Sequence, residues 1–218
     1  MQDSMQNRRP LRRLGFTLVE LLAVILIISI LFAFLTPMVT DAIRTARVTA
    51  CKANLGNIYD GLNMYYLKYS EVPRHGGVKF FASVISREAI ENTKNNAEKM
   101  TCPAVEKSSL AGLLDSEWSE WFSDLERVDG TYSAYAGRDI KNHPLRQWPP
   151  SGNEPLISDD NDGGMNHPTT TNVLYGDRSV RSFELVTLRE EGKLGPEDKL
   201  LDVGPSAPVP DLTKFTLD

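Results

Sequence analysis

Hydrophobic and polar positions along the chain fall into three patterns. Residues 21–35 read LLAVILIISILFAFL without a charge, and about 20 apolar residues are enough to cross a bilayer core as a helix. Apolar side chains then recur at steps of three and four residues to about Tyr69, which predicts an amphipathic continuation of the same helix. From Gly130 onward, short segments typical of β-strands are separated by turn residues. Together these patterns predict an α+β fold, in which a long N-terminal helix, membrane-spanning in its first half, packs on a small antiparallel β-sheet domain with additional short helices.

Breaker residues divide this plan further. Pro37 lacks a backbone N–H, so it is expected to loosen the helix rather than end it. A hairpin is predicted at 172–185, with Gly176-Asp177 as a two-residue primed turn. The predicted divisions are a basic leader at 1–15, a transmembrane helix at 16–36, its amphipathic continuation at 37–70, a helical and loop insertion at 71–129 that includes a helix through 110–125, a small β region at 130–190, and a loosely held C-terminal tail at 191–218.

The distribution of charge predicts the orientation in the membrane. The net charge is −5, yet Arg8, Arg9, Arg12 and Arg13 all precede the apolar run. By the positive-inside rule these arginines stay cytoplasmic, and the chain beyond the run lies on the periplasmic or extracellular side. No basic stripe interleaved with aromatic residues follows the leader in the sequence, which argues against a nucleic-acid partner.

Glu20 is the one carboxylate at the start of the apolar run. Such a charge costs roughly 2.5–3.5 kcal/mol on insertion scales, so it indicates a function unless the side chain snorkels to the interface. A secretory signal peptide or a twin-arginine signal would have a shorter apolar core and a cleavage site after it. A plain single-pass anchor fits the length and the charges but leaves Glu20 unexplained.

The segment GFTLVE at residues 15–20 resembles the prepilin processing motif of type IV pilins and type II secretion pseudopilins. The resemblance implies that prepilin peptidase cuts after Gly15, that Phe16 becomes the N-methylated mature N-terminus, and that Pro37 matches the family's proline. It also implies a single-pass protein of the inner membrane that assembles with other pilin-like subunits through its N-terminal helix. In such an assembly Glu20 would neutralise the new amino group of a neighbouring subunit, because a buried charge needs a partner.

The C-terminal half extends the resemblance to a pseudopilin-like subgroup with a histidine, nine residues and then Asp-Gly. His167 and Asp177 have that spacing, but Arg178 stands in place of the glycine and Ser179 in place of a second histidine. We expect a hydrogen bond between His167 and Asp177 that locks the hairpin. Without the second histidine, these residues leave too few obvious ligands for a transition-metal site.

Two further groups carry candidate chemistry. Cys51 and Cys102 are expected on the oxidising side of the membrane, where a disulfide would stabilise the fold by ~4 kcal/mol; two buried free thiols are the alternative. Asp159, Asp160 and Asp162 lie on a glycine-rich loop that suits calcium, although the loop fails the EF-hand pattern and a solvated acidic turn is the alternative.

These observations predict a structural protein without a cofactor other than calcium. His167, Asp177 and Ser179 lack a nucleophile elbow or a glycine-rich oxyanion loop, so the chain is not expected to be an enzyme. The predicted function is that of a pseudopilin subunit, processed by prepilin peptidase and assembled into a pilus or a type II secretion-like pseudopilus. The alternative is a single-pass, membrane-anchored protein that binds a ligand or calcium outside the cytoplasm and does not polymerise.

Overall fold

The computed structural model describes residues 16–114 and 116–218. The predicted leader, including Gly15, lies outside the described residues. The chain separates into two compact units, Met1–Ile43 and Arg44–Asp218. Helix α1 (Leu18–Tyr69) contributes residues to both units, which are described in turn.

The first unit consists, in its described part, of the apolar beginning of α1. The most apolar 18-residue window of this helix has a mean hydropathy of 3.0 and none of it is buried. By length and composition the helix is sufficient to cross a membrane. Pro37 lies inside α1, and the helix continues past it as expected. The long N-terminal apolar helix predicted from the sequence is therefore confirmed.

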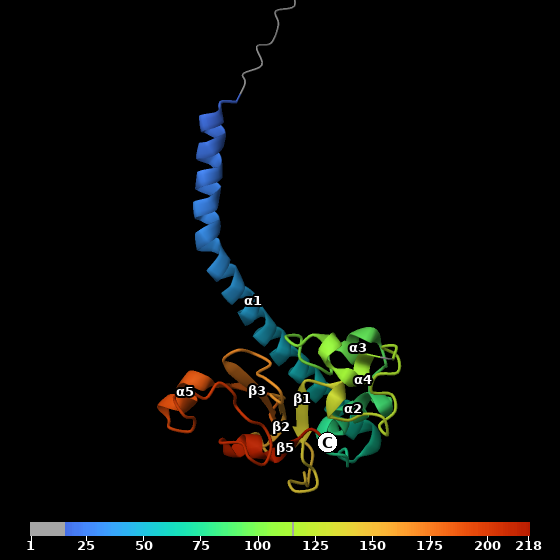
Figure 1. Ribbon diagram of the computed structural model, residues 1–218. Helices are drawn as coiled ribbons and strands as arrows, with labels where there is room; N and C mark the ends of the chain where they lie inside the picture. The colour runs from blue at the N-terminus through green and yellow to red at the C-terminus, as the bar shows by residue number, and fades with distance from the viewer. Residues whose placement is uncertain (1–15, 115) are drawn as a thin grey trace, which may run out of the picture. The chain divides into compact units, whose positions relative to one another are not determined.

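The second unit is built on a five-stranded antiparallel sheet with the strand order β4-β3-β2-β1-β5. Figure 1 labels β1, β2, β3 and β5 of this sheet. The neighbouring strands pair antiparallel throughout. This sheet, packed with α1 and several short helices, confirms the predicted α+β fold. The strands are β1 (Tyr135–Arg138), β2 (Pro155–Asp159), β3 (Thr170–Tyr175), β4 (Val180–Glu184) and β5 (Phe215–Thr216).

Short helices fill the connections between the strands. Figure 1 shows α2, α3 and α4 gathered on one side of the sheet and α5 on the other. The prediction of a helix through 110–125 is wrong beyond Leu114, where α4 ends. The chain turns in this segment: Phe122 has a left-handed φ of 59°, and the Trp121 indole N–H donates a hydrogen bond to the Ser116 carbonyl. The helices are α2 (Gly77–Ser86), α3 (Lys94–Glu98), α4 (Ala111–Leu114) and α5 (Leu185–Glu190), with 3-10 turns η1 (Lys107–Ser109), η2 (Gly130–Tyr132) and η3 (Pro210–Lys214).

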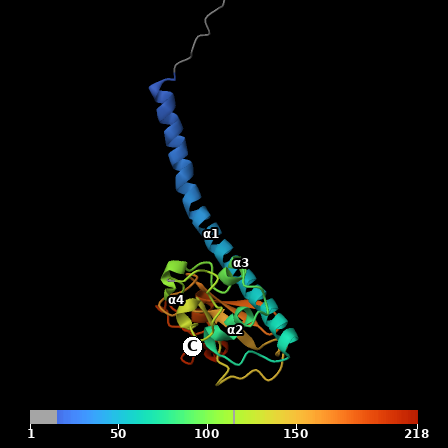
Figure 2. The ribbon, with the colours of Figure 1, turned by 90° about the vertical axis from the view of Figure 1, so that its right-hand side faces the viewer.

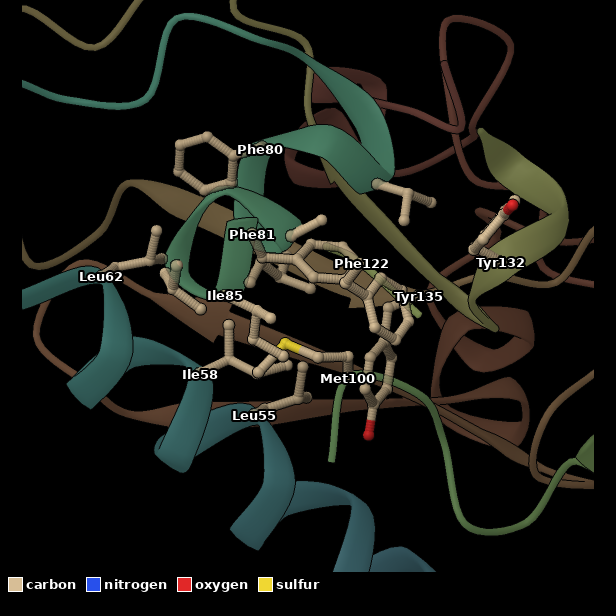
Figure 3. Close-up of a cluster of buried hydrophobic side chains, with 14 of the residues drawn as sticks. Leu55, Ile58, Leu62, Phe80, Phe81, Ile85, Met100, Phe122, Tyr132 and Tyr135 are labelled. Atoms are coloured by element: carbon tan, nitrogen blue, oxygen red, sulfur yellow. The ribbon is translucent and has the colours of Figure 1, made fainter. Parts of the chain in front are cut away.

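One hydrophobic core lies between the second half of α1, α2 and one face of the sheet. Figure 2 shows this part of α1 running alongside the strands. Leu55, Ile58 and Leu62 recur at helical spacing and are buried. Figure 3 shows these three side chains pointing towards Met100 and the aromatic rings of α2, as the amphipathic pattern predicts.

A second core covers the opposite face of the sheet. Because successive strand residues point to opposite faces, Val173 and Tyr175 of β3 face this core while Leu174 faces the first. The C-terminal segment closes it with Leu201, Val209, Leu212 and Phe215, all buried.

The prediction of a loosely held tail at 191–218 therefore needs correction. The Asn161 amide donates a hydrogen bond to the Leu201 carbonyl at 2.8 Å, and the Tyr175 hydroxyl donates to Asp211 at 2.6 Å. Phe215 also pairs with Arg138 where β5 joins β1. The many prolines and glycines of the segment suggested a loop, but its scattered apolar residues are needed to bury the second face of the sheet.

Candidate functional site

The beginning of α1 forms a reciprocal cap between Thr17 and Glu20. One Glu20 carboxylate oxygen accepts hydrogen bonds from the Thr17 backbone N–H at 2.9 Å and the Thr17 hydroxyl at 2.8 Å. The Glu20 backbone N–H donates to the Thr17 hydroxyl oxygen at 3.2 Å. This is the capping box that a Thr-x-x-Glu spacing favours. Sequence reasoning singled out Glu20 for its charge and missed this second role, although the spacing signals it.

Four candidate residues meet in a buried polar cluster in the second unit. Cys51 comes from α1, Cys102 from the loop after α3, Asp159 from the end of β2, and His167 from the loop before β3. Their side chains are at most 2% exposed. One sulfur, carboxylate oxygen or ring nitrogen from each lies within 4.8 Å of the others. Each residue was a candidate in the sequence, but their convergence was not predicted.

The local structure explains how the two cysteines reach this point. Cys51 lies one helical turn before Leu55, on the face of α1 that packs on the sheet. The Asn54 side chain, on the next turn, donates to the Thr101 carbonyl at 3.3 Å. The Thr101 hydroxyl in turn accepts from the Ala134 N–H at 2.9 Å. Cys102 is thus held between α1 and the start of the sheet.

Short contacts connect the members of the cluster. The Cys51 thiol donates to Asp159 Oδ1 at 3.1 Å, and Cys102 Sγ lies 3.4 Å from His167 Nε2. His167 Nε2 lies 3.7 Å from Asp159 Oδ2. Asn172 fixes the carboxylate, because its backbone N–H and its side-chain amide both donate to Asp159 Oδ2, at 2.7 and 2.8 Å.

Burial and mutual contact separate the proton affinities of these groups. The hydrogen bond with Cys51, followed by that with His167, lowers the pKa of Cys102 against the opposing effect of burial. The same bond with Cys102, together with burial and the Asp159 charge, raises the pKa of Cys51. Burial lowers the pKa of His167, but its contacts with Cys102 and Asp159 outweigh this and raise it. Cys102 is thus the more acidic of the two thiols.

The structure does not bring His167 and Asp177 together. Asp177 is exposed in the turn between β3 and β4, where it accepts a hydrogen bond from the Ser179 N–H at 3.0 Å. The turn also differs from the predicted primed type, because its positive φ of 68° falls on Arg178 rather than on Gly176 or Asp177. Gly176 is required for a different reason: a Cβ there would lie 2.3 Å from the Ser151 carbonyl oxygen.

The cysteines and the acidic loop are placed as follows. Cys51 and Cys102 are both free thiols, although their sulfurs lie within 4.8 Å. The three carboxylates expected to bind calcium do not converge, because Asp159 is in the buried cluster while Asp160 accepts a hydrogen bond from the Asp162 N–H at 2.8 Å. Among the described residues, the one group of three or more candidate ligands that closes on a common point is the buried cluster.

The fold and the first helix define a class: an α+β protein whose long apolar N-terminal helix is suited to a membrane anchor. Residues 11–36 match the family model of the prokaryotic N-terminal methylation motif. This match supports a prepilin-like protein of the type IV pilin-like family, as the residues around Gly15 predict, and that family is structural rather than enzymatic. The match ends before the His167 region, so the resemblance there stays a prediction. Comparison with curated proteins and with solved structures gave no match.

Proposed function

We propose that the chain is a structural pseudopilin subunit that assembles into a pilus or a type II secretion-like pseudopilus. In this proposal prepilin peptidase cuts after Gly15 and Phe16 is then methylated. The observation that carries the proposal is the coincidence of the methylation motif at residues 11–36 with the capped start of a long apolar helix.

Exposed apolar surface on this helix supports an assembly role. From Phe16 to Ile43, every large hydrophobic side chain is exposed, in contrast to the buried face of α1 beyond Cys51. Apolar surface on this scale is characteristic of a membrane or protein interface. The inner membrane would bury it before assembly, with the N-terminus cytoplasmic and the second unit periplasmic or extracellular. Helices of neighbouring subunits would bury it afterwards.

Glu20 has a role in each stage. In the precursor its carboxylate caps α1 through Thr17. Cleavage after Gly15 would place a positive amino group on Phe16, directly before Thr17. A neighbouring subunit's Glu20 would then neutralise this amino group in an apolar surrounding, where an unpaired charge is strongly unfavourable. Pro37 remains the proposed second assembly position.

Processing is tested by intact-mass spectrometry of the chain expressed with a prepilin peptidase. The expected mass is that of a chain that begins at Phe16 and carries one methyl group. A chain that keeps its leader when the peptidase is active on a control substrate contradicts the proposal.

Assembly is tested with Glu20→Gln and Glu20→Ala, followed by cross-linking in membranes and by recovery of filaments. Glutamine preserves the capping box but removes the charge, whereas alanine removes both. We expect both variants to be processed and neither to assemble. Glu197→Ala, an equal loss of charge at an exposed site of the second unit, is the matched control and should assemble as the parent does. Normal assembly of Glu20→Gln would show that the charge has no such role.

A further inference from the structure

The buried polar cluster has the composition of a metal centre. We propose that Cys51, Cys102, Asp159 and His167 bind one divalent transition-metal ion, with zinc as the first choice. Thiolate sulfur, imidazole nitrogen and carboxylate oxygen are the ligands that zinc takes in proteins, and four of them complete its tetrahedral shell. This site is separate from the proposed assembly function, which rests on the first helix.

The structure supplies the ligands that the sequence interpretation lacked. The sequence pattern predicts that His167 pairs with Asp177 across the hairpin, and two ligands are too few for a metal site. The fold instead brings His167 to Cys102 and to Asp159, whose other oxygen faces Cys51. The four ligands are spread along the chain from Cys51 to His167 and form no short metal-binding motif in the sequence.

Distances between the candidate ligand atoms are close to those of a tetrahedral site. Metal–ligand bonds of ~2.0–2.3 Å at tetrahedral angles place neighbouring ligand atoms about 3.3–3.8 Å apart. Two contacts fall in this range, since Cys102 Sγ lies 3.4 Å from His167 Nε2 and His167 Nε2 lies 3.7 Å from Asp159 Oδ2. The third, between Cys51 Sγ and the other Asp159 oxygen, Oδ1, is slightly shorter at 3.1 Å. Since all four ligand atoms lie within 4.8 Å of one another, only small side-chain shifts would be needed to accommodate the ion.

Neighbouring groups orient the ligands as an outer shell does in metal sites. Asn172 holds Asp159 Oδ2 with two hydrogen bonds, while Oδ1 faces Cys51 and also accepts a hydrogen bond from the Asn166 side-chain amide at 3.4 Å. The Tyr135 hydroxyl donates to Cys51 Sγ at 3.4 Å, and the Asn172 amide approaches the same sulfur at 3.7 Å. In Figure 3 the Tyr135 hydroxyl points out of the aromatic cluster, which leaves it free for this polar contact. These donors would stabilise a thiolate ligand.

The burial of all four ligands points to a structural ion rather than a catalytic one. A catalytic zinc keeps one position open to water or substrate, whereas a structural site has four protein ligands. The ion would join α1, the loop after α3, the end of β2 and the loop before β3. It would also offset the negative charge of two thiolates and one carboxylate, which is costly in a buried site without a cation.

Metal content of the full chain, purified in detergent without chelators, tests the proposal. We expect about one zinc per chain by elemental mass spectrometry. After replacement of zinc by cobalt(II), we expect the intense visible bands of tetrahedral cobalt and a near-ultraviolet thiolate-to-cobalt band. The cobalt spectrum needs no substitution, so it remains informative if variants fail to fold.

Variants identify the ligands. Cys102→Ser and His167→Gln should lower zinc occupancy at least tenfold. Asp177→Asn is the control: it changes the exposed turn residue that the sequence spacing predicts as the partner of His167, and it should leave zinc occupancy unchanged. Three results would overturn the proposal: a zinc-free chain with two titratable thiols, an intact mass two hydrogens lighter because Cys51 and Cys102 form a disulfide, or a cobalt spectrum that Cys102→Ser does not alter.

Discussion

The turn between β3 and β4 is fastened to α1 by an ion pair whose contribution can be measured. Arg178 Nε donates to Asp60 Oδ1 at 2.8 Å, and a terminal guanidinium nitrogen lies 2.6 Å from Oδ2. Both side chains are about half exposed, at 55% and 50%. Such pairs contribute ~0.2–1 kcal/mol, and the two-point geometry places this one in the upper half of that range.

The backbone conformation of Arg178 opposes the stabilisation by the ion pair. Its φ of 68° is left-handed, which costs a residue other than glycine roughly 1–2 kcal/mol. Arg178→Ala keeps this strain and loses the pair, so it should destabilise the fold by about 0.5–1 kcal/mol. Arg178→Gly also loses the ion pair, but it relieves the backbone strain. The greater freedom of glycine in the unfolded chain destabilises this variant by about 0.4–1 kcal/mol, which offsets part of that relief. We therefore expect the glycine variant to be at least as stable as the alanine variant.

The assay is urea unfolding of the detergent-solubilised chain, followed by tryptophan fluorescence. Trp148 is a suitable reporter because its ring packs on that of Tyr59, with 5.5 Å between the ring centroids, and Tyr59 directly precedes Asp60 in the chain. A double-mutant cycle with Asp60→Ala and Arg178→Ala should give a coupling of about 0.5–1 kcal/mol that decreases with added salt. A coupling near zero would show that the pair contributes nothing, and an Arg178→Gly variant less stable than Arg178→Ala would refute the strain argument.

Three other perturbations have expected outcomes. Gly137→Ala should lower the melting temperature by several degrees, because the alanine Cβ would lie 1.8 Å from the Gly77 carbonyl oxygen. Overpacking of this kind costs ~1–3 kcal/mol or more. An unchanged melting temperature would contradict this contact. Burial raises the pKa of Glu154, but the contacts of its carboxylate with Arg138 and Lys214 outweigh burial and lower the pKa below 4.5. The ionised carboxylate therefore stabilises the fold above pH 4.5, and this stabilisation is lost as the pH falls through the folded-state pKa. Glu154→Gln should therefore cost about 1–2 kcal/mol in urea unfolding at pH 7, and this cost should decrease as the pH falls through the folded-state pKa of Glu154; a cost independent of pH would refute the assignment. Zinc at 100 times its dissociation constant should stabilise the chain by about 2.7 kcal/mol over the chelated form, and equal melting temperatures with zinc and with chelator would contradict a structural ion.

Sequence periodicity predicted the parts of the fold that depend on local pattern. The face of α1 with Leu55, Ile58 and Leu62 has the helical period, and the hairpin of β3 and β4 has short strands around a Gly-Asp turn. In both cases the residues that set the pattern are close in the chain, so their spacing determines which side chains share a face.

Features that depend on residues distant in the chain could not be predicted, because local spacing carries no information about distant partners. Nothing near Leu212 shows that it covers the far face of a sheet whose strands begin at Tyr135. Cys51 and Asp159 are in hydrogen-bond contact across 108 residues. The sequence marked both as chemically interesting, but only the antiparallel order of the strands and the packing of α1 bring them together.

The ten-residue step from His167 to Asp177 shows how spacing can mislead. Strand β3 occupies most of that interval, and six residues of strand extend about 20 Å, so the two side chains lie at opposite ends of β3 and cannot bond. Each end is instead joined to α1: the first through His167 and the buried cluster with Cys51, the second through Arg178 and Asp60.

These two connections to α1 should act independently. Cys51 and Asp60 are separated by nine helical residues, about 13 Å along the axis, and sites more than ~7–10 Å apart without shared partners have additive effects on stability. The free-energy change of Cys102→Ser combined with Arg178→Ala should therefore equal the sum of the single changes within about 0.5 kcal/mol. Urea unfolding of the two single variants and the double variant measures this. A double variant that departs from additivity by more than 1 kcal/mol would mean that β3 and α1 dock as one cooperative unit, in which loss of either connection loosens the other.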